Sequence, residues 1–382
     1  MQRMWWSSSF YRVAIVLVLV ALLPALALGQ PMQRKIVVFR SEINDAGQQE
    51  AVVHGMGCGG LKHLPLINAV VAEFPAGTVS AQARPFQVAY VEDDLPVQAL
   101  GLVSPQAVQQ VQPAQAIPWG VKYILSRRAW PTDTGAGVRV CTLDTGIDLT
   151  HPDLQANIYG GYNTITPGAS YADDNGHGTH VAGIIAACDN SIGVIGVAPG
   201  ANLYAVKVLD SSGSGYTSDI IEGLNWAVAN NMQIVNMSLG LSADLQSFHD
   251  AVTAAYQAGV VLIAAAGNND GPTLYPAAYP EVVSVAATDM YGNRVSFSNF
   301  GKVELSAPGV AIRSTILTGY YGRMSGTSMA SPHVAGVAAL VLARHPGYTP
   351  DQVVADMQST ATHIDVATYT GAGEVNAFLA SR

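Results

Sequence analysis

The sequence has few cysteines and few charged residues. Its 382 residues include three cysteines, Cys58, Cys141 and Cys188, which are too few and too scattered for a disulfide scaffold or a cysteine-rich zinc site. Charged residues make up 12% of the chain, about half of the ~25% usual in globular proteins. The net charge of −9 argues against a nucleic-acid partner, because affinity for phosphates comes mainly from Lys and Arg.

Apolar residues are abundant, at 49% of the chain, and the 38 glycines follow no collagen-like period. This composition excludes disordered and fibrous proteins and can bury a large core. A chain of 382 residues exceeds one average domain, so we expect one large domain with accessory segments.

The chain begins with a pattern typical of export. Arg3 and Arg12 precede an apolar run at 13–29 that only Pro24 interrupts, and small residues near its end suit signal-peptidase cleavage before Gln30. We therefore expect the first 29 residues to be a signal peptide and the protein to be secreted. The alternative is an uncleaved membrane anchor, but the run is at the lower edge of the roughly 17–25 residues that a spanning helix needs. Nothing later in the sequence is long and apolar enough to span a bilayer.

Residues 30–100 differ from the rest of the chain in their pattern of apolar and polar residues. Short strand candidates at 35–40, 69–74 and 88–92 alternate with more polar stretches, which predicts a small α+β unit. The stretch 101–113, rich in Gln, Pro and Val, has no periodicity and is interpreted as a linker.

From residue 137 onward, apolar strands alternate with helices. The expected strands are 138–143, 203–209, 233–238 and 260–266, and the expected helices are 177–187, 217–230 and 245–258. Such alternation predicts an α/β fold with a mostly parallel central sheet and helices on both faces. In these folds, sites gather at the carboxyl ends of the strands.

Four polar residues stand at the ends of expected strands or helices. Asp144 directly follows the first strand, and Asn268 follows the strand at 260–266. His177 opens a helix and suits proton transfer near neutral pH. Ser328 opens an apolar helix, whose positive end favours negative charge developing beside it. Each has an ordinary alternative, such as a turn aspartate or an N-cap serine.

The helices that begin near His177 and Ser328 contain a second histidine and a proline. A metal site at His177 and His180 is an alternative, but no glutamate of the H-E-x-x-H type lies between them and no third ligand is near. Pro332 fits the first turn of the helix after Ser328, because N–H groups there have no helical partner.

Three motifs in the chain resemble the active-site motifs of a known family. Asp-Thr-Gly at 144–146, His-Gly-Thr-His-Val-Ala-Gly at 177–183 and Gly-Thr-Ser-Met-Ala-Ser-Pro at 326–332 resemble the active-site motifs of the subtilisin family of serine peptidases (subtilases). Their order, Asp then His then Ser, is also that of the family. The resemblance extends from about Ala114 to near the C-terminus, and implies a subtilisin-like peptidase domain over 114–382.

The resemblance implies a role for each residue. Ser328 would be the nucleophile, His177 the general base, and Asp144 the group that orients the imidazole. Asn268 and the Ser328 N–H would form the oxyanion hole, and His180 would be structural. The resemblance also implies segments that pair with an extended protein or peptide substrate. These segments comprise Gly213, Ser214, Gly215, Ser238, Leu239 and Gly240.

A structural Ca²⁺ ion is a further implication of the resemblance. Its oxygen ligands would come from the side chains of Gln115, Asp153 and Asn190 and the carbonyls of Cys188, Ile192 and Val194. Oxygen donors on a flexible loop suit this ion.

By the same resemblance, residues 30–100 are an inhibitory propeptide that assists folding, most clearly at 90–94. We expect cleavage after Leu100, with Val97 in an upstream pocket. The chain is thus interpreted as a monomeric, secreted endopeptidase made as a self-processed zymogen. A catalytically inactive binding protein and an ester-cleaving or acyl-transferring hydrolase are the alternatives. Cys141 and Cys188 are interpreted as small buried apolar side chains, with a disulfide or a redox role as the alternatives that secretion would permit.

Overall fold

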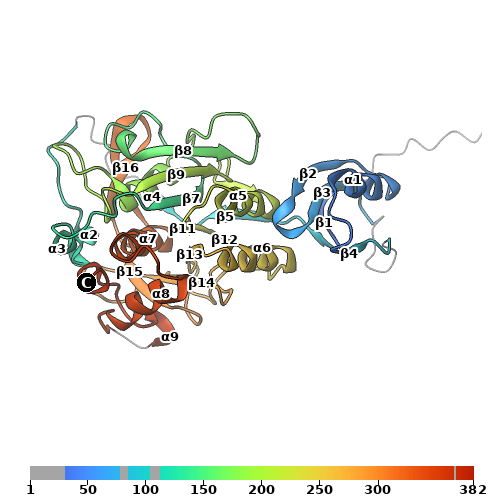
Figure 1. Ribbon diagram of the computed structural model, residues 1–382. Coiled ribbons are helices and arrows are strands. Elements are labelled where there is room, and N and C mark those ends of the chain that lie inside the picture. Colours follow the sequence, from blue (N-terminus) through green and yellow to red (C-terminus); the bar gives the residue numbers. More distant parts are fainter. Residues whose placement is uncertain (1–30, 78–84, 104–111, 365–366) are drawn as a thin grey trace, which may run out of the picture.

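The structure is a computed structural model that describes residues 31–77, 85–103, 112–364 and 367–382 (Figure 1). The predicted signal peptide and most of the predicted linker lie outside these residues. Within the described part of the chain, no helix has the length and apolar character needed to cross a membrane.

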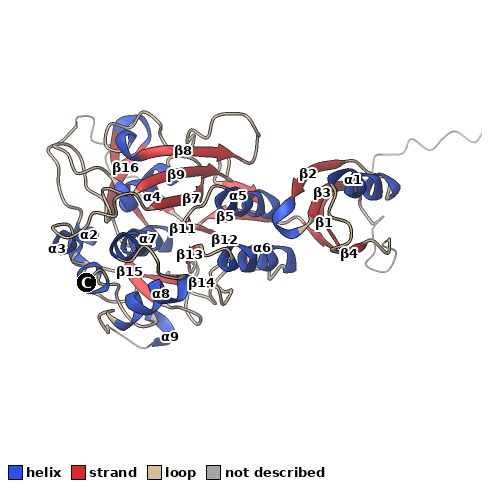
Figure 2. Ribbon diagram, viewed as in Figure 1, coloured by secondary structure: helices blue, strands red, loops and turns tan. Residues whose placement is uncertain are grey.

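A seven-stranded, fully parallel sheet forms the centre of the larger unit (Figure 2). In spatial order its strands are β15 (Leu305–Pro308), β14 (Val282–Thr288), β13 (Val261–Ala265), β11 (Ile234–Met237), β7 (Arg139–Asp144), β9 (Asn202–Lys207) and β8 (Ile158–Asn163). The residues of β13, β11 and β14 are all buried, as expected for strands covered on both faces.

Helices cover both faces of this sheet, which confirms the predicted α/β fold. α4 (His177–Ala186) and α7 (Thr327–Arg344) share one hydrophobic core with it. α5 (Thr217–Ala229) and α6 (Gln246–Gln257) pack in a second core on the other side. The other helices of this unit are α2 (Trp119–Tyr123), α3 (Ser126–Ala129), α8 (Pro350–Ser359), α9 (Ala367–Thr370) and α10 (Ala377–Ala380).

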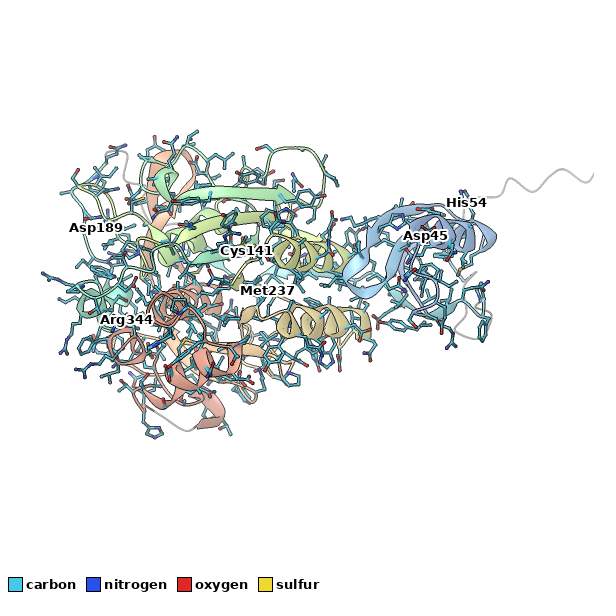
Figure 3. All side chains as sticks on the ribbon, viewed as in Figure 1. Asp45, His54, Cys141, Asp189, Met237 and Arg344 are labelled. Carbon is cyan, nitrogen blue, oxygen red and sulfur yellow. The ribbon has the colours of Figure 1, made fainter. Side chains whose placement is uncertain are left out.

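The N-terminal residues fold as a separate small unit beside α5 and α6 (Figure 1). Its antiparallel sheet has the order β2 (Gly60–Leu64), β3 (Ala69–Pro75), β1 (Met32–Phe39), β4 (Val88–Asp93). α1 (Ala46–Gly55) packs on it, with Asp45 at its start and His54 in its last turn (Figure 3). The three predicted strands are confirmed, whereas α1 and β2 were not predicted.

The chain that follows β4 crosses the larger unit as two short strands. β5 (Pro96–Ala99) lies between β10 (Ser214–Tyr216) and β12 (Leu239–Gly240) and is antiparallel to both. β6 (Leu102–Val103) then pairs with the edge of a hairpin made of β16 (Ile312–Ile316) and β17 (Tyr320–Ser325). Residues 100 and 101 connect these two strands.

Candidate active site

Asp144 is the last residue of β7 and is fully buried. One of its carboxylate oxygens lies 2.7 Å from His177 Nδ1 and accepts the N–H of Thr145, also at 2.7 Å. Its backbone carbonyl accepts the N–H groups of Val208 and Leu209. Because both backbone and side chain are held, the carboxylate has a fixed direction toward the imidazole.

His177 is the first residue of α4, directly after Gly176, whose φ of 104° favours glycine. Burial alone would lower the pKa of His177, but the charge and hydrogen bond of Asp144, with the charge of Asp173, outweigh it and raise the pKa. The imidazole beside Asp144 is therefore more easily protonated than the imidazole of a buried histidine without a carboxylate partner.

Asn268 lies just beyond β13. Its side-chain oxygen accepts both the N–H and the hydroxyl of Thr327 at 2.9 Å. This fixes the amide orientation, and the NH₂ group donates to the carbonyl of Leu100. The Gly101 backbone lies against the imidazole, since a Cβ on Gly101 would come within 2.8 Å of His177 Nε2. The Leu100–Gly101 peptide bond thus lies between the amide and the imidazole.

Ser328 is the second residue of α7 and is fully buried. Its hydroxyl donates to the carbonyl of Ser238 at 3.0 Å, and the Leu100 N–H donates to the same carbonyl at 3.1 Å. Among the described residues, His177 Nε2 has no hydrogen-bond partner. The resting hydroxyl is therefore bonded to the backbone and not to the imidazole.

The position of Pro332 differs from the prediction. α7 begins at Thr327, so Pro332 is its sixth residue and lies beyond the first turn. A proline there removes a helical hydrogen bond. The acceptor left without that bond is the carbonyl of Ser328, which instead accepts the hydroxyl of Ser238 at 3.0 Å.

The two predicted substrate-binding segments flank β5. Gly215 pairs with Val97, Ser214 with Gln98, and Leu239 with Ala99. The carbonyl of Gly213 also accepts the Ala99 N–H at 2.9 Å, and Gly240 pairs with Gln98. A Cβ on Gly240 would come within 3.0 Å of Leu100 Cδ1 and 3.3 Å of Leu274 Cβ. In the structure, these segments therefore hold β5, an extended part of the same chain, through backbone pairing.

Comparison with known proteins identifies the family. Residues 135–378 match the model of the subtilase family. The chain belongs to the subtilase family. It is 49% identical over 271 residues to the "Thermostable alkaline protease" of Halalkalibacterium halodurans, covering 70% of this chain and 74% of that protein. It is also 39% identical over 387 residues to "Subtilisin NAT" of Bacillus subtilis subsp. natto and to "Subtilisin E" of Bacillus subtilis, covering 98% of each chain.

Family membership makes this subtilase a serine endopeptidase, with protein substrates. The assignment agrees with the buried Asp144–His177 pair and with a buried serine at a helix start.

The predicted calcium ligands of this subtilase lie together where the chain near residue 115 meets the loop after α4. The Asp153 carboxylate accepts the Asn190 amide and the Val194 N–H, both at 2.8 Å. The Gln115 amide donates to the Cys188 carbonyl at 2.8 Å and approaches that of Val194 at 3.5 Å. Ile192 is on the same loop, where its N–H donates to Asn190.

This donor set fits a hard cation. The ligating atoms would all be oxygens once the Gln115 amide is turned. Burial raises the pKa of Asp153, although its hydrogen bonds to Val194 and Asn190 act in the opposite direction. A buried carboxylate is stabilised by a nearby cation. Among the described residues, no group of three or more His, Cys, Asp or Glu side chains is placed to hold a metal ion, so backbone and amide oxygens would supply most of the ligands.

Sequence reasoning missed Asp173, Thr145 and Lys207. Asp173 accepts the N–H and hydroxyl of Thr179 on α4 and also the hydroxyl of Thr145, which follows Asp144. The buried Lys207 ammonium donates to the carbonyls of Thr145 at 2.8 Å and Leu209 at 3.0 Å. These bonds join the strand that carries the aspartate to the helix that carries the histidine. For Lys207 the sequence did offer a signal, because a lysine at the end of an apolar strand is unusual.

The three cysteines are free and buried. Cys141 lies inside the central sheet (Figure 3), where burial raises the pKa of its thiol. The structure therefore agrees with an apolar packing role for these side chains.

Proposed function

We propose that this subtilase is a secreted endopeptidase that uses Asp144, His177 and Ser328 as a catalytic triad and processes its own precursor at Leu100–Gly101. The observation that carries the proposal is the position of this peptide bond. Its carbonyl oxygen accepts the Asn268 amide, and its glycine lies against His177.

The chemistry follows from these positions. Rotation of the Ser328 side chain away from the Ser238 carbonyl would let its hydroxyl proton pass to His177 Nε2 as its oxygen bonds to the Leu100 carbonyl carbon. Asn268 stabilises the oxyanion. The bond to the Gly101 nitrogen then breaks, and that nitrogen takes the proton from His177. Water releases the acyl group by the reverse sequence.

The N-terminal unit is suited to act as an inhibitory propeptide spanning residues 30–100. Glu92 accepts the N–H groups of Gln246 and Ser247 at the start of α6, each at 3.0 Å. Asp94 accepts the Ser218 N–H at the start of α5 at 2.9 Å. Carboxylates are favoured at helix N-termini. β5 would stay between its two partner strands after cleavage, so the product would block the cleft until the unit is degraded.

Calcium is proposed as the ion held by Gln115, Asp153, Asn190 and the neighbouring carbonyls. Its contribution is structural, because it would join the chain near residue 115 to the loop after α4. The ligand carbonyls would be those of Cys188, Ile192 and Val194.

The test compares the full chain with its Ser328→Ala variant. The wild type should clear casein and yield a fragment that begins at Gly101, whereas the variant should stay at full length. A serine-directed phosphonylating reagent should abolish clearing. Ester hydrolysis without casein clearing would favour the hydrolase alternative, and no reaction with the reagent would favour the binding protein. Cleavage far from Gly101 would contradict the proposed processing site.

A further inference from the structure

The first observation is the register of β6 on β17. Leu102 pairs with Ser325 and Val103 with Met324, in antiparallel orientation. Counted from the Leu100–Gly101 bond, these are the second and third residues on its carboxyl side. A substrate that continues for one more residue in this register has its fourth residue opposite Arg323.

The second observation is a pair of arginines across the hairpin. Arg313 of β16 pairs directly with Arg323 of β17. Residues directly opposite in an antiparallel pair project from the same face of the sheet, and like charges there destabilise it. The Arg313 guanidinium lies 5.7 Å from the centre of the Tyr321 ring. Arg323 is exposed and forms no ion pair with any residue that the structure describes.

The third observation is a cavity on that face. It measures about 510 Å³ and both arginines line it, together with Trp119, Met290 and Tyr291. Met290 and Tyr291 are 57% and 78% exposed. The carboxylate in its wall, Asp289, already accepts the N–H groups of Tyr291 and Asn293 at 2.9 and 3.0 Å. The cavity thus combines apolar walls with two positive charges.

We propose that Arg323, supported by Arg313, is a specificity-determining residue that selects substrates with an acidic side chain at the fourth position beyond the cleaved bond. The proposal rests on the proposed function, because it takes 100–103 as the path of a substrate. The fourth residue is on the face of the arginines. The third is opposite Met324, so its side chain projects from the other face.

This alternation supplies a matched pair of substrates. Two quenched fluorescent peptides share the sequence Leu-Gly-Leu around the cleaved bond and have the same composition, but one continues Gln-Glu and the other Glu-Gln. Only the first has its acidic residue at the fourth position. We expect the kcat/KM of the Gln-Glu peptide to be about 2- to 5-fold higher than that of the Glu-Gln peptide, the range for an exposed ion pair. The ratio of the two kcat/KM values should approach one at high salt, because salt screens the charges.

Variants of the subtilase complete the test. Arg323→Gln should remove the preference while the Glu-Gln peptide is cleaved as by the wild type, which also reports correct folding. Arg323→Glu should favour lysine at the fourth position. Arg344→Gln, which removes the same charge at the end of α7 (Figure 3), should keep the preference.

Different results would contradict the role of Arg323 and the peptidase activity. Equal cleavage of both peptides by the wild type, or a preference that survives in Arg323→Gln, overturns the role of Arg323 and leaves the peptidase intact. Failure of the wild type to cleave either peptide or casein contradicts the proposed function itself.

Discussion

The hydroxyl of Ser238 donates to the backbone carbonyl of Ser328 at 3.0 Å, and the hydroxyl of Ser328 donates to the carbonyl of Ser238 at the same distance. The first bond is needed because Pro332 offers no N–H to that carbonyl. The reciprocal pair ties α7 to the end of β11. It also holds the proposed nucleophile beside the strand that would bind substrate.

Removing the Ser238 hydroxyl should therefore destabilise the protein. In the uncleaved Ser328→Ala background, Ser238→Ala leaves a buried carbonyl without a partner and should lower the free energy of unfolding by about 1–3 kcal/mol. Urea denaturation measures this change. In a Pro332→Ala background the helical N–H to the residue 328 carbonyl is restored, so Ser238→Ala should lower the free energy of unfolding by less. Equal losses of unfolding free energy in both backgrounds would refute this account of the bond.

The pH dependence of activity should follow the raised pKa of His177. Only the neutral imidazole accepts a proton, so kcat/KM should fall as the pH drops through this pKa. The Asp173 charge is one of the causes of the rise, so Asp173→Asn should move this limb of the profile to lower pH. Asp133→Asn, which alters a carboxylate that accepts a turn N–H elsewhere, should leave the profile in place. An unmoved limb in Asp173→Asn would exclude this electrostatic contribution.

The sequence was sufficient to predict the central fold because its strands and helices have strong local patterns. β13 is a continuous apolar run, and α7 is rich in small and apolar residues. In the N-terminal unit, α1 has only two buried residues, Gln49 and Val53, so its pattern is weak and it was missed.

Long-range pairing could not be predicted in the same way. The register of β5 between β10 and β12 depends on residues more than a hundred positions away, and no local pattern encodes it. Pro332 was placed in the first turn because helix starts are uncertain by a few residues. The motifs located the candidate site, but the bond from Ser328 to Ser238 and the network around Asp173 required coordinates.

Calcium removal should lower the melting temperature. At a free Ca²⁺ concentration 100 times the Kd, a bound ion stabilises the folded state by about 2.7 kcal/mol. EGTA should therefore lower the melting temperature of the Ser328→Ala protein, as measured by calorimetry. Asp153→Asn should remove this effect, whereas Asp189→Asn, an exposed residue on the same loop (Figure 3), should retain it. An unchanged melting temperature in EGTA would argue against the site.

Glu374 should make the protein less stable at alkaline pH. This carboxyl is 2% exposed, and both of its oxygens contact the Thr288 hydroxyl, at 2.9 and 3.1 Å. Burial raises the pKa of Glu374 from 4.5 to about 8, against the effect of the Thr288 hydrogen bond and with a contribution from the Asp289 charge. Between these two pH values the unfolded chain has lost this proton while the folded chain keeps it. Stability is therefore lost as the pH rises through this window, and the loss stays constant above it.

A neutral side chain of the same shape should remove that loss. We expect Glu374→Gln to raise the free energy of unfolding by an amount on the order of 3–5 kcal/mol at pH 9 and by almost nothing at pH 4. Urea denaturation of the Ser328→Ala protein at both pH values measures the difference. Glu42→Gln, which removes an exposed carboxylate, should have little effect at either. A Glu374→Gln protein no more stable than its parent at pH 9 would mean that the folded protein compensates this charge, because an uncompensated carboxylate at this depth must oppose folding.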